Sequence, residues 1–222
     1  SLTSITIPKS VTSIGNFAFY GCGKLTVYLE NGSTLTSGQL GVDASKIRTY
    51  WNEGNLTWTL TADGTMTISG SGAMKGYSWY SGSPAAQKKD NVKKVVIENG
   101  ITSIGAYAFS GCTNLASIEI PSSVTSIGNY AFRDCSSLAS IEIPSSVTSI
   151  GDCAFYNCTG LTSITIPDSV TSIGDCAFER CSNLASITIP DGVKSIGDSA
   201  FESCTGLTSI EIPSNVESIG NY

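Results

Sequence analysis

The sequence predicts an α/β repeat solenoid, a fold in which short strands and short helical turns recur in successive coils. A strict 23-residue period is the main reason, because a repeat of 20 to 50 residues is typical of solenoids. No single copy has enough apolar residues to enclose a core, so neighbouring copies must stack to bury a continuous one. Copies begin at Val92, Leu115, Leu138, Leu161 and Leu184, with a truncated copy at Leu207 and a separate copy at Leu2.

The first part of each copy predicts a short strand. Positions are numbered here as offsets from the first residue of a copy, which is offset zero. In the copy "LTSITIPDSVTSIGDCAFERCSN", Leu161, Ile164 and Ile166 are apolar and have β-branched neighbours. Pro167 follows and ends the strand, because proline has no amide to donate to a ladder. Offsets 3 and 5 therefore point inward, and offsets 2 and 4 point outward.

The second part of each copy predicts another extended run and then a helical segment. "SVTSI" is extended, and Gly174 follows it where a turn needs an unrestricted backbone. "DCAFERC", residues 175–181, fits one or two helical turns with Asp175 as the N-cap. Asn129 and Asp198 occupy the same position in other copies. Each unit thus reads as strand, turn, short strand and short helix.

The repeat resembles the BspA-like leucine-rich repeats of bacterial surface proteins, whose unit reads L-x-x-I-x-I-P-x-x-V-x-x-I-G-x-x-A-F-x-x-C. The match covers residues 1–30 and 92–222. The resemblance implies a curved, right-handed leucine-rich-repeat solenoid with a parallel sheet on one face. It also implies a protein that host-associated bacteria secrete or display on the cell surface, and use for adhesion and protein binding.

Residues 31–91 interrupt the period and divide the chain. Residues 1–30 are expected to end a first array, and 31–52 to form a cap or connector that closes it. Residues 53–91 are expected to be a small β-hairpin insert, because apolar residues alternate on both sides of Asp63-Gly64. Residues 92–222 form a second array of five full repeats and one truncated repeat. The insert should cover the N-terminal edge of this second array.

Composition excludes several classes of function. Charged residues make up 14%, against a usual share of about 25%. Residues 1–91 carry seven Lys/Arg and five Asp/Glu, and residues 92–222 carry five and thirteen, which gives +2 and −8. An acidic array without a basic patch argues against nucleic acid, and no apolar run of about 20 residues could insert into a membrane. Because the chain lacks an initiator Met and stops within a repeat, we expect a piece of a longer protein.

Histidine is absent, which removes the commonest general base and metal ligand. We therefore expect no enzyme activity and no cofactor. Six cysteines share offset 20 and predict a ladder of buried free thiols, in preference to an occasional disulfide or a metal site. They are Cys22, Cys112, Cys135, Cys158, Cys181 and Cys204. Cys153 and Cys176 occupy offset 15 in adjacent copies, and whether they form a mutual disulfide is left open. A four-thiolate zinc site is disfavoured because the usual ligand spacing is missing.

Two surfaces are candidates for binding. The first is the outward face of the sheet at offset 4, which offers small and acidic residues without an aromatic or arginine anchor. Its residues are Glu119, Glu142, Thr165, Thr188 and Glu211. The second is an aromatic platform in the insert, where Trp79 and Tyr80 are expected to be the most exposed aromatic residues. Aromatic residues can stack on sugars or peptides, although the insert also needs large side chains to build its own core.

These observations lead to three functional hypotheses. The preferred one is a non-enzymatic, extracellular, monomeric module that binds a host or bacterial surface protein. The second is carbohydrate recognition through the aromatic insert. The third is a passive spacer that holds another domain away from the cell wall.

Overall fold

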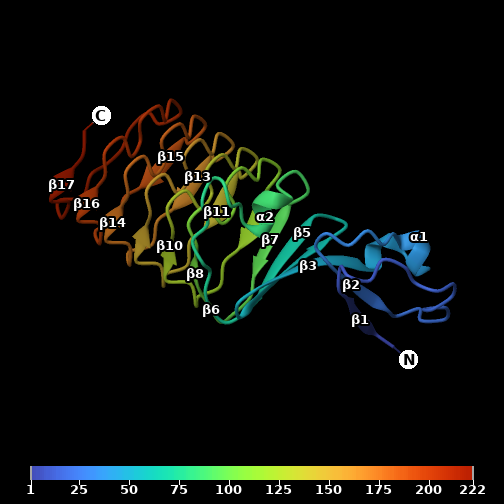
Figure 1. The fold of residues 1–222 in the computed structure, drawn as a ribbon. Helices are drawn as coiled ribbons and strands as arrows, with labels where there is room; N and C mark the ends of the chain where they lie inside the picture. Colours follow the sequence, from blue (N-terminus) through green and yellow to red (C-terminus); the bar gives the residue numbers. More distant parts are fainter. Residues whose placement is uncertain (1, 222) are drawn as a thin grey trace.

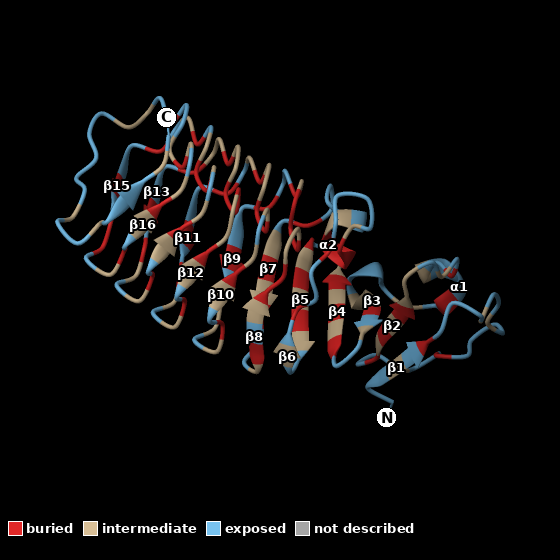
Figure 2. Ribbon diagram, turned by 60° about the vertical axis from the view of Figure 1, so that its left-hand side comes forward, coloured by how far each residue is buried: buried red, intermediate tan, exposed pale blue. Residues whose placement is uncertain are grey.

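The computed structural model describes residues 2–221, which form an elongated solenoid with the two termini at opposite ends (Figure 1). Strands of successive coils pair in parallel, and residues 23 positions apart are hydrogen-bonded neighbours. Ser140 pairs with Ser163, and Ser163 pairs with Ser186. The predicted repeat solenoid is confirmed in this respect. Figure 2 shows the buried residues forming a continuous line through the stacked coils.

Two sheets form one face of the solenoid, a long one of seven strands and a short one of three. The strands of the long sheet are hydrogen-bonded in the order β1-β2-β3-β4-β5-β7-β9. They are β1 (Ser4–Ile7), β2 (Thr26–Glu30), β3 (Ile47–Glu53), β4 (Leu56–Thr61), β5 (Thr65–Gly70), β7 (Lys94–Ile97) and β9 (Ser117–Glu119). Three further strands continue the same face: β11 (Ser140–Glu142), β13 (Ser163–Thr165) and β15 (Ser186–Thr188).

A further, narrower sheet is formed by the "SI" residues at offsets 11 and 12 of the repeat copies, together with β6 of the insert. Its strand order is β17-β16-β14-β12-β10-β8-β6, so it follows the coils in sequence. The strands are β6 (Gly72–Ala73), β8 (Ile101–Ile104), β10 (Ser126–Ile127), β12 (Ser149–Ile150), β14 (Ser172–Ile173), β16 (Ser195–Ile196) and β17 (Ser218–Ile219). The strand at the start of each copy and the second extended run were both predicted.

The predicted helical turns are wrong, and the fold is a β-solenoid for which the α/β description is too loose. Among the described residues, helices occur only as α1 (Ser37–Leu40), α2 (Pro84–Gln87) and the 3-10 helix η1 (Ala44–Lys46). All three lie between the arrays. Residues 175–181 and their equivalents form consecutive turns instead.

Hydrogen bonds between coils explain why these segments do not become helices. The amides of Tyr130, Phe132 and Asp134 donate to carbonyls of the following coil at 2.8 to 2.9 Å. The amides of Ala131 and Arg133 instead donate to carbonyls three residues earlier at 3.2 Å. To alternate in this way, Tyr130 and Asp134 adopt positive φ angles of 60° and 61°. An α-helix keeps every φ near −63° and every amide bonded within the segment, so the two arrangements are incompatible.

The predicted helix N-cap also has a different role. Asp175 does not cap a helix; its carboxylate oxygen Oδ1 accepts from the backbone amide of Asp198 at 2.8 Å. Asp152 Oδ1 likewise accepts from the amide of Asp175 at 3.1 Å, and Asn129 Oδ1 accepts from Asp152 at 3.0 Å. As expected, the side chain at offset 14 accepts a hydrogen bond from a backbone amide, but that amide belongs to the next coil. This position therefore connects neighbouring coils.

The glycine at offset 13 is required by close packing between coils and not by its backbone angle. A Cβ on Gly174 would lie 2.6 Å from the amide nitrogen of Asp152, much closer than real Cβ contacts. The expectation of an unrestricted turn backbone was wrong at this position, since the left-handed conformations of this segment occur at offsets 15 and 19 instead. Only glycine lets the coils approach to hydrogen-bonding distance here.

Two columns of side chains fill the core of the second array. The first is a stack of phenylalanines with ring centroids 5.3 to 5.5 Å apart and nearly parallel planes. It comprises Phe109, Phe132, Phe155, Phe178 and Phe201. The second is the cysteine ladder, in which each thiol from Cys135 onward donates to the carbonyl of the phenylalanine in the preceding coil at 3.0 to 3.2 Å. These weak bonds give each buried thiol a partner within the core.

The insert is part of the long sheet. Strands β4 and β5 pair antiparallel around Asp63-Gly64, as the alternating pattern predicted. β3 pairs parallel with β2, and β5 pairs parallel with β7, so the sheet continues from one array to the other. Trp58 is fully buried and packs on Phe109 with ring centroids 5.9 Å apart. It therefore covers the N-terminal end of the phenylalanine stack.

Candidate functional site

The residues that were predicted to point outward from the sheet are exposed. In β9, β11, β13 and β15 the central isoleucine is buried, and the residues on either side of it are exposed. This places Glu119, Glu142, Thr165 and Thr188 in one column along this face, and Thr165 is directly paired with Glu142 and Thr188. Glu211 is also exposed but lies outside any strand, because the last coil does not continue the sheet on this face. The column contains no aromatic or arginine residue.

Larger side chains occur on the same face nearer the N-terminus. Tyr28 of β2, with Arg48 and Tyr50 of β3, lines a hollow of about 530 Å³ on the sheet. The remaining lining is mostly threonine from β4 and β5, with Asn52 and Glu98. Sequence reasoning missed this hollow because it followed the sheet face only through the second array. The alternation of "TVYLE" and "IRTYWNE" could have identified it.

The charges on this face are mixed. Lys94 Nζ lies 2.6 Å from Glu119 Oε1, and both side chains are largely exposed. Partial burial raises the pKa of Tyr50, and the nearby Glu30 carboxylate raises it further. Tyr50 is therefore a neutral hydrogen-bonding phenol at physiological pH. Together with Tyr28 and Arg48 it supplies the residue types that dominate binding energy at protein interfaces.

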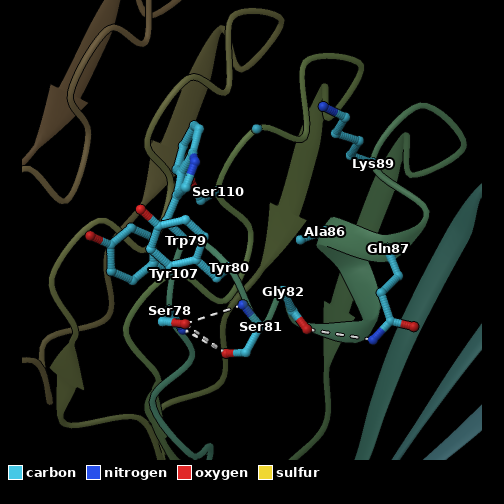
Figure 3. A pocket seen from close by; sticks show the side chains of 11 residues that line it. Ser78, Trp79, Tyr80, Ser81, Gly82, Ala86, Gln87, Lys89, Tyr107 and Ser110 are labelled. Atoms are coloured by element: carbon cyan, nitrogen blue, oxygen red, sulfur yellow. Dashed lines mark hydrogen bonds between the residues drawn. The ribbon is translucent and has the colours of Figure 1, made fainter.

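The aromatic residues of the insert divide into buried and exposed ones. Trp51, Trp58 and Tyr77 are buried and form the core of the insert. Trp79 is 58% exposed and Tyr80 is 97% exposed, so these two residues have the exposure that was predicted. Both line a pocket of about 460 Å³ between the insert and the first coil of the second array (Figure 3).

An arginine holds the exposed tryptophan in place. The guanidinium carbon of Arg133 lies 4.6 Å from the centre of the Trp79 ring, and 5.3 Å from that of Tyr156. Tyr107, which also lines the pocket, stacks on Tyr130 with ring centroids 4.6 Å apart. These contacts fix the aromatic side chains without burying them.

All eight cysteines are free thiols. The five at offset 20 in the second array are buried, and Cys22 of the first array is partly exposed. Burial raises the pKa of Cys112 to about 12 and that of Cys181 to about 12. Cys153 and Cys176 are unbridged, and burial is the main cause that raises the pKa of each. Such thiols are protonated at neutral pH and are poor nucleophiles.

Neither a metal-binding cluster nor a membrane-spanning helix occurs in residues 2–221. This part of the chain has no group of three or more Cys, Asp or Glu residues arranged to hold a metal ion. None of its helices is both long and apolar enough to cross a membrane.

The chain belongs to the BspA-type leucine-rich repeat family. The family model matches in six copies that cover residues 1–39, 82–163 and 125–222. This confirms the resemblance inferred from the repeat unit. No curated protein gave a significant match.

Solved structures of bacterial leucine-rich repeat proteins are similar to this chain. The leucine-rich repeat protein of T. pallidum is 32% identical with a TM-score of 0.59, over 77% of this chain and 85% of that one. A leucine-rich repeat protein from Bacteroides ovatus is 27% identical with a TM-score of 0.49, over 77% of this chain and 55% of that one. A leucine-rich cell surface protein from Faecalibacterium prausnitzii is 29% identical with a TM-score of 0.46, over 72% of this chain and 54% of that one.

Proposed function

We propose that this chain is a non-enzymatic, monomeric protein-interaction module of a bacterial cell-surface protein, and that it acts outside the cell in adhesion. The observation that carries the proposal is the hollow on the outward sheet face that Tyr28, Arg48 and Tyr50 line. Protein interfaces concentrate their binding energy in buried tyrosine, tryptophan and arginine residues, surrounded by contacts of little individual effect.

The two parts of the outward sheet face have different roles in this proposal. The hollow provides the anchors that a partner would bury. The column from Glu119 to Thr188 provides a broad, solvent-exposed and weakly acidic surface on the same face as the hollow. Rim charges of this kind influence the association rate and its salt dependence more than the final affinity. A partner with a basic surface opposite Glu119 and Glu142 fits this arrangement.

A binding screen with matched variants tests the proposal. The intact chain is screened against purified extracellular host proteins and bacterial surface proteins by surface plasmon resonance. We expect Tyr50→Ala to weaken binding by about thirtyfold, which corresponds to an anchor worth about 2 kcal/mol. Thr165→Ala, on the same face but outside the hollow, should change affinity by less than about threefold.

Two outcomes contradict the proposal. Absence of binding to every protein in the panel would favour a spacer. Binding that Tyr50→Ala and Arg48→Ala leave unchanged would place the interface elsewhere on the molecule.

A further inference from the structure

We infer that the pocket between the insert and the first coil of the second array is a binding site for a saccharide. Its walls come from two parts of the chain (Figure 3): the loop 78–82 with Ala86, Gln87 and Lys89 on one side, and the turn that carries Tyr107, Ser110 and Gly111 on the other. Its volume of about 460 Å³ lies within the range of roughly 300 to 1,000 Å³ found for small-ligand sites.

The pocket exists because Ser110 is small. Offset 18 carries larger residues in the following coils, all of them partly or fully exposed: Arg133, Tyr156, Glu179 and Glu202. A serine at the same position leaves a space, and the insert encloses it. The pocket is therefore a local departure from the repeat, and it lies at the coil that the insert covers.

A buried hydroxyl group in this pocket has no partner. Ser110 is 8% exposed, and its Oγ makes no hydrogen bond to any other described residue. Leaving such a group unsatisfied costs about 1 to 3 kcal/mol. The Oγ itself has almost no accessible surface, so a ligand would remove this cost only by drawing the Ser110 side chain toward the pocket, where the hydroxyl can donate or accept.

The aromatic side chains give the pocket a second feature suited to sugars. Trp79 and Tyr80 from the loop, and Tyr107 from the facing turn, lie near one another in its lining (Figure 3). Arg133 holds Trp79, and Tyr130 stacks on Tyr107, so both rings keep their positions without being buried. Rigid aromatic faces beside hydroxyl partners suit a pyranose ring, which has apolar C–H faces and a polar edge.

The walls of the pocket are fixed before any ligand binds. The Ser83 hydroxyl donates to the Ala108 carbonyl, and the Tyr77 amide donates to the Ala106 carbonyl at 2.9 Å. Within the loop, the Ser78 and Ser81 side chains lie 2.9 Å apart, and each accepts from the backbone amide of the other residue at 3.1 Å. A pre-formed site loses little conformational entropy on binding.

The chemistry of the lining favours a sugar over a peptide. Lys89 is its only charged residue, and Ala86 is its only aliphatic side chain. An extended proline-rich peptide also binds aromatic grooves, but it cannot donate a hydrogen bond to a buried hydroxyl through proline. Sugar hydroxyls donate and accept, which matches the unpaired Ser110.

The test uses the intact chain, fluorescently labelled, on a glycan array and on a parallel array of proline-rich peptides. Glycans that bind are then titrated by calorimetry against three variants. We expect Trp79→Ala to weaken binding by about tenfold, because it removes a stacking face. Tyr20→Ala is the control: Tyr20 is 83% exposed at the same offset as Ser110 in the first array, and it should not affect binding.

Ser110→Ala distinguishes a role of Ser110 in ligand binding from a purely structural role. Removing an unpaired buried hydroxyl should leave the melting temperature unchanged or raise it, while weakening sugar binding by about threefold to tenfold. If Ser110 had only a structural role, its removal would not weaken sugar binding while leaving the melting temperature unchanged or higher.

Four results would overturn the assignment. The first is that no glycan binds, and the second is that only proline-rich peptides bind. The third is glycan binding that neither Trp79→Ala nor Ser110→Ala weakens. The fourth is binding that Trp79→Ala weakens but Ser110→Ala does not, which would place the sugar on the exposed rings outside the pocket. None of these results depends on the protein-binding hollow at Tyr50, so the two proposals are tested separately.

Discussion

The first and second arrays have the same repeat but bury it to different extents. Isoleucine occupies offset 12 in both. In the second array Ile150 and Ile173 are each 2% exposed, whereas Ile14 in the first array is only partly buried. Ile219, in the last described coil, is 58% exposed. Since the residue is the same, the neighbouring coils decide how far it is buried.

This difference shows what stabilises the fold. A coil between two others has both its flat sides covered, whereas a coil with one neighbour leaves apolar side chains in water. Phe17 of the first array is 80% exposed, whereas Tyr107 and Tyr130 at the same offset in the second array are partly buried. Stability in such a molecule is a sum of interfaces between neighbours rather than a property of each repeat.

Truncating the phenylalanine stack should produce the largest loss. Phe155 lies between Phe132 and Phe178 and is fully buried, so Phe155→Ala should lower the free energy of unfolding by about 3 to 5 kcal/mol. Phe19→Ala changes the same offset in the first array, where the ring is 9% exposed, and should cost clearly less. Urea denaturation of the two variants measures both values. Equal losses would refute the view that stacking on both sides determines stability.

Adding one methyl group at offset 13 should have the next largest effect. In Gly174→Ala the new Cβ would lie 2.6 Å from the Asp152 amide, so the coils must separate, at a cost of about 1 to 3 kcal/mol. In Gly15→Ala, the equivalent change in the first array, nothing lies within 4 Å of the new Cβ. Thermal unfolding should show a lower midpoint for the first variant and little change for the second. A similar shift in both would mean that glycine is needed there for another reason.

The buried thiols should make the second array sensitive to alkaline pH. Burial raises the pKa of Cys112 and of Cys181 to about 12, above the usual value of 9.0. The folded state therefore keeps these protons after the unfolded chain has lost them. Stability should be complete below about pH 8 and fall above pH 9 by about 1.4 kcal/mol per pH unit for each thiol.

Urea denaturation under reducing conditions between pH 8 and 10 measures this slope. Cys181→Ala removes one thiol, so its stability should fall less steeply with pH than that of the parent chain. Parallel slopes for the two proteins would contradict the assignment of the effect to the buried thiol.

The smallest effect is expected at offset 19. Ser203 adopts a positive φ of 59°, and the first array has Gly21 at this offset with a φ of 78°. Ser203→Gly should relieve the strain of the left-handed conformation, and part of that gain is offset by the greater freedom of glycine in the unfolded chain. We expect a net gain of about 0.5 kcal/mol, and a loss of similar size in Gly21→Ala. A lower melting temperature for Ser203→Gly would contradict this account.

The sequence predicted the parts of the fold that depend on periodicity. The 23-residue spacing, the inward isoleucines, the buried cysteine column and the hairpin at Asp63-Gly64 all follow from alternation and repeat length. The helical turns did not follow. Residues 175–181 satisfy a helical pattern locally, but the amides of Cys176, Phe178 and Arg180 donate to the next coil in the structure. A pattern within one copy carries no information about a hydrogen-bond partner in the next copy.

The candidate sites were predicted less completely. The exposure of Trp79 and Tyr80 could be anticipated from their position in a Gly- and Ser-rich loop. Their placement beside Ser110 could not, because Ser110 lies in a coil that comes at least thirty residues later in the sequence than Trp79 and Tyr80. The hollow at Tyr28 and Tyr50 joins strands of the first array and the connector in the same way.

By itself, the sequence determined the repeat length, the identity of the core columns and the family, because each depends on residue type at a fixed interval. Tertiary structure alone decided which copies are fully buried, why offset 13 must be glycine and where the pocket forms. These properties depend on distances between atoms of different coils. Only the stacked chain brings those atoms together.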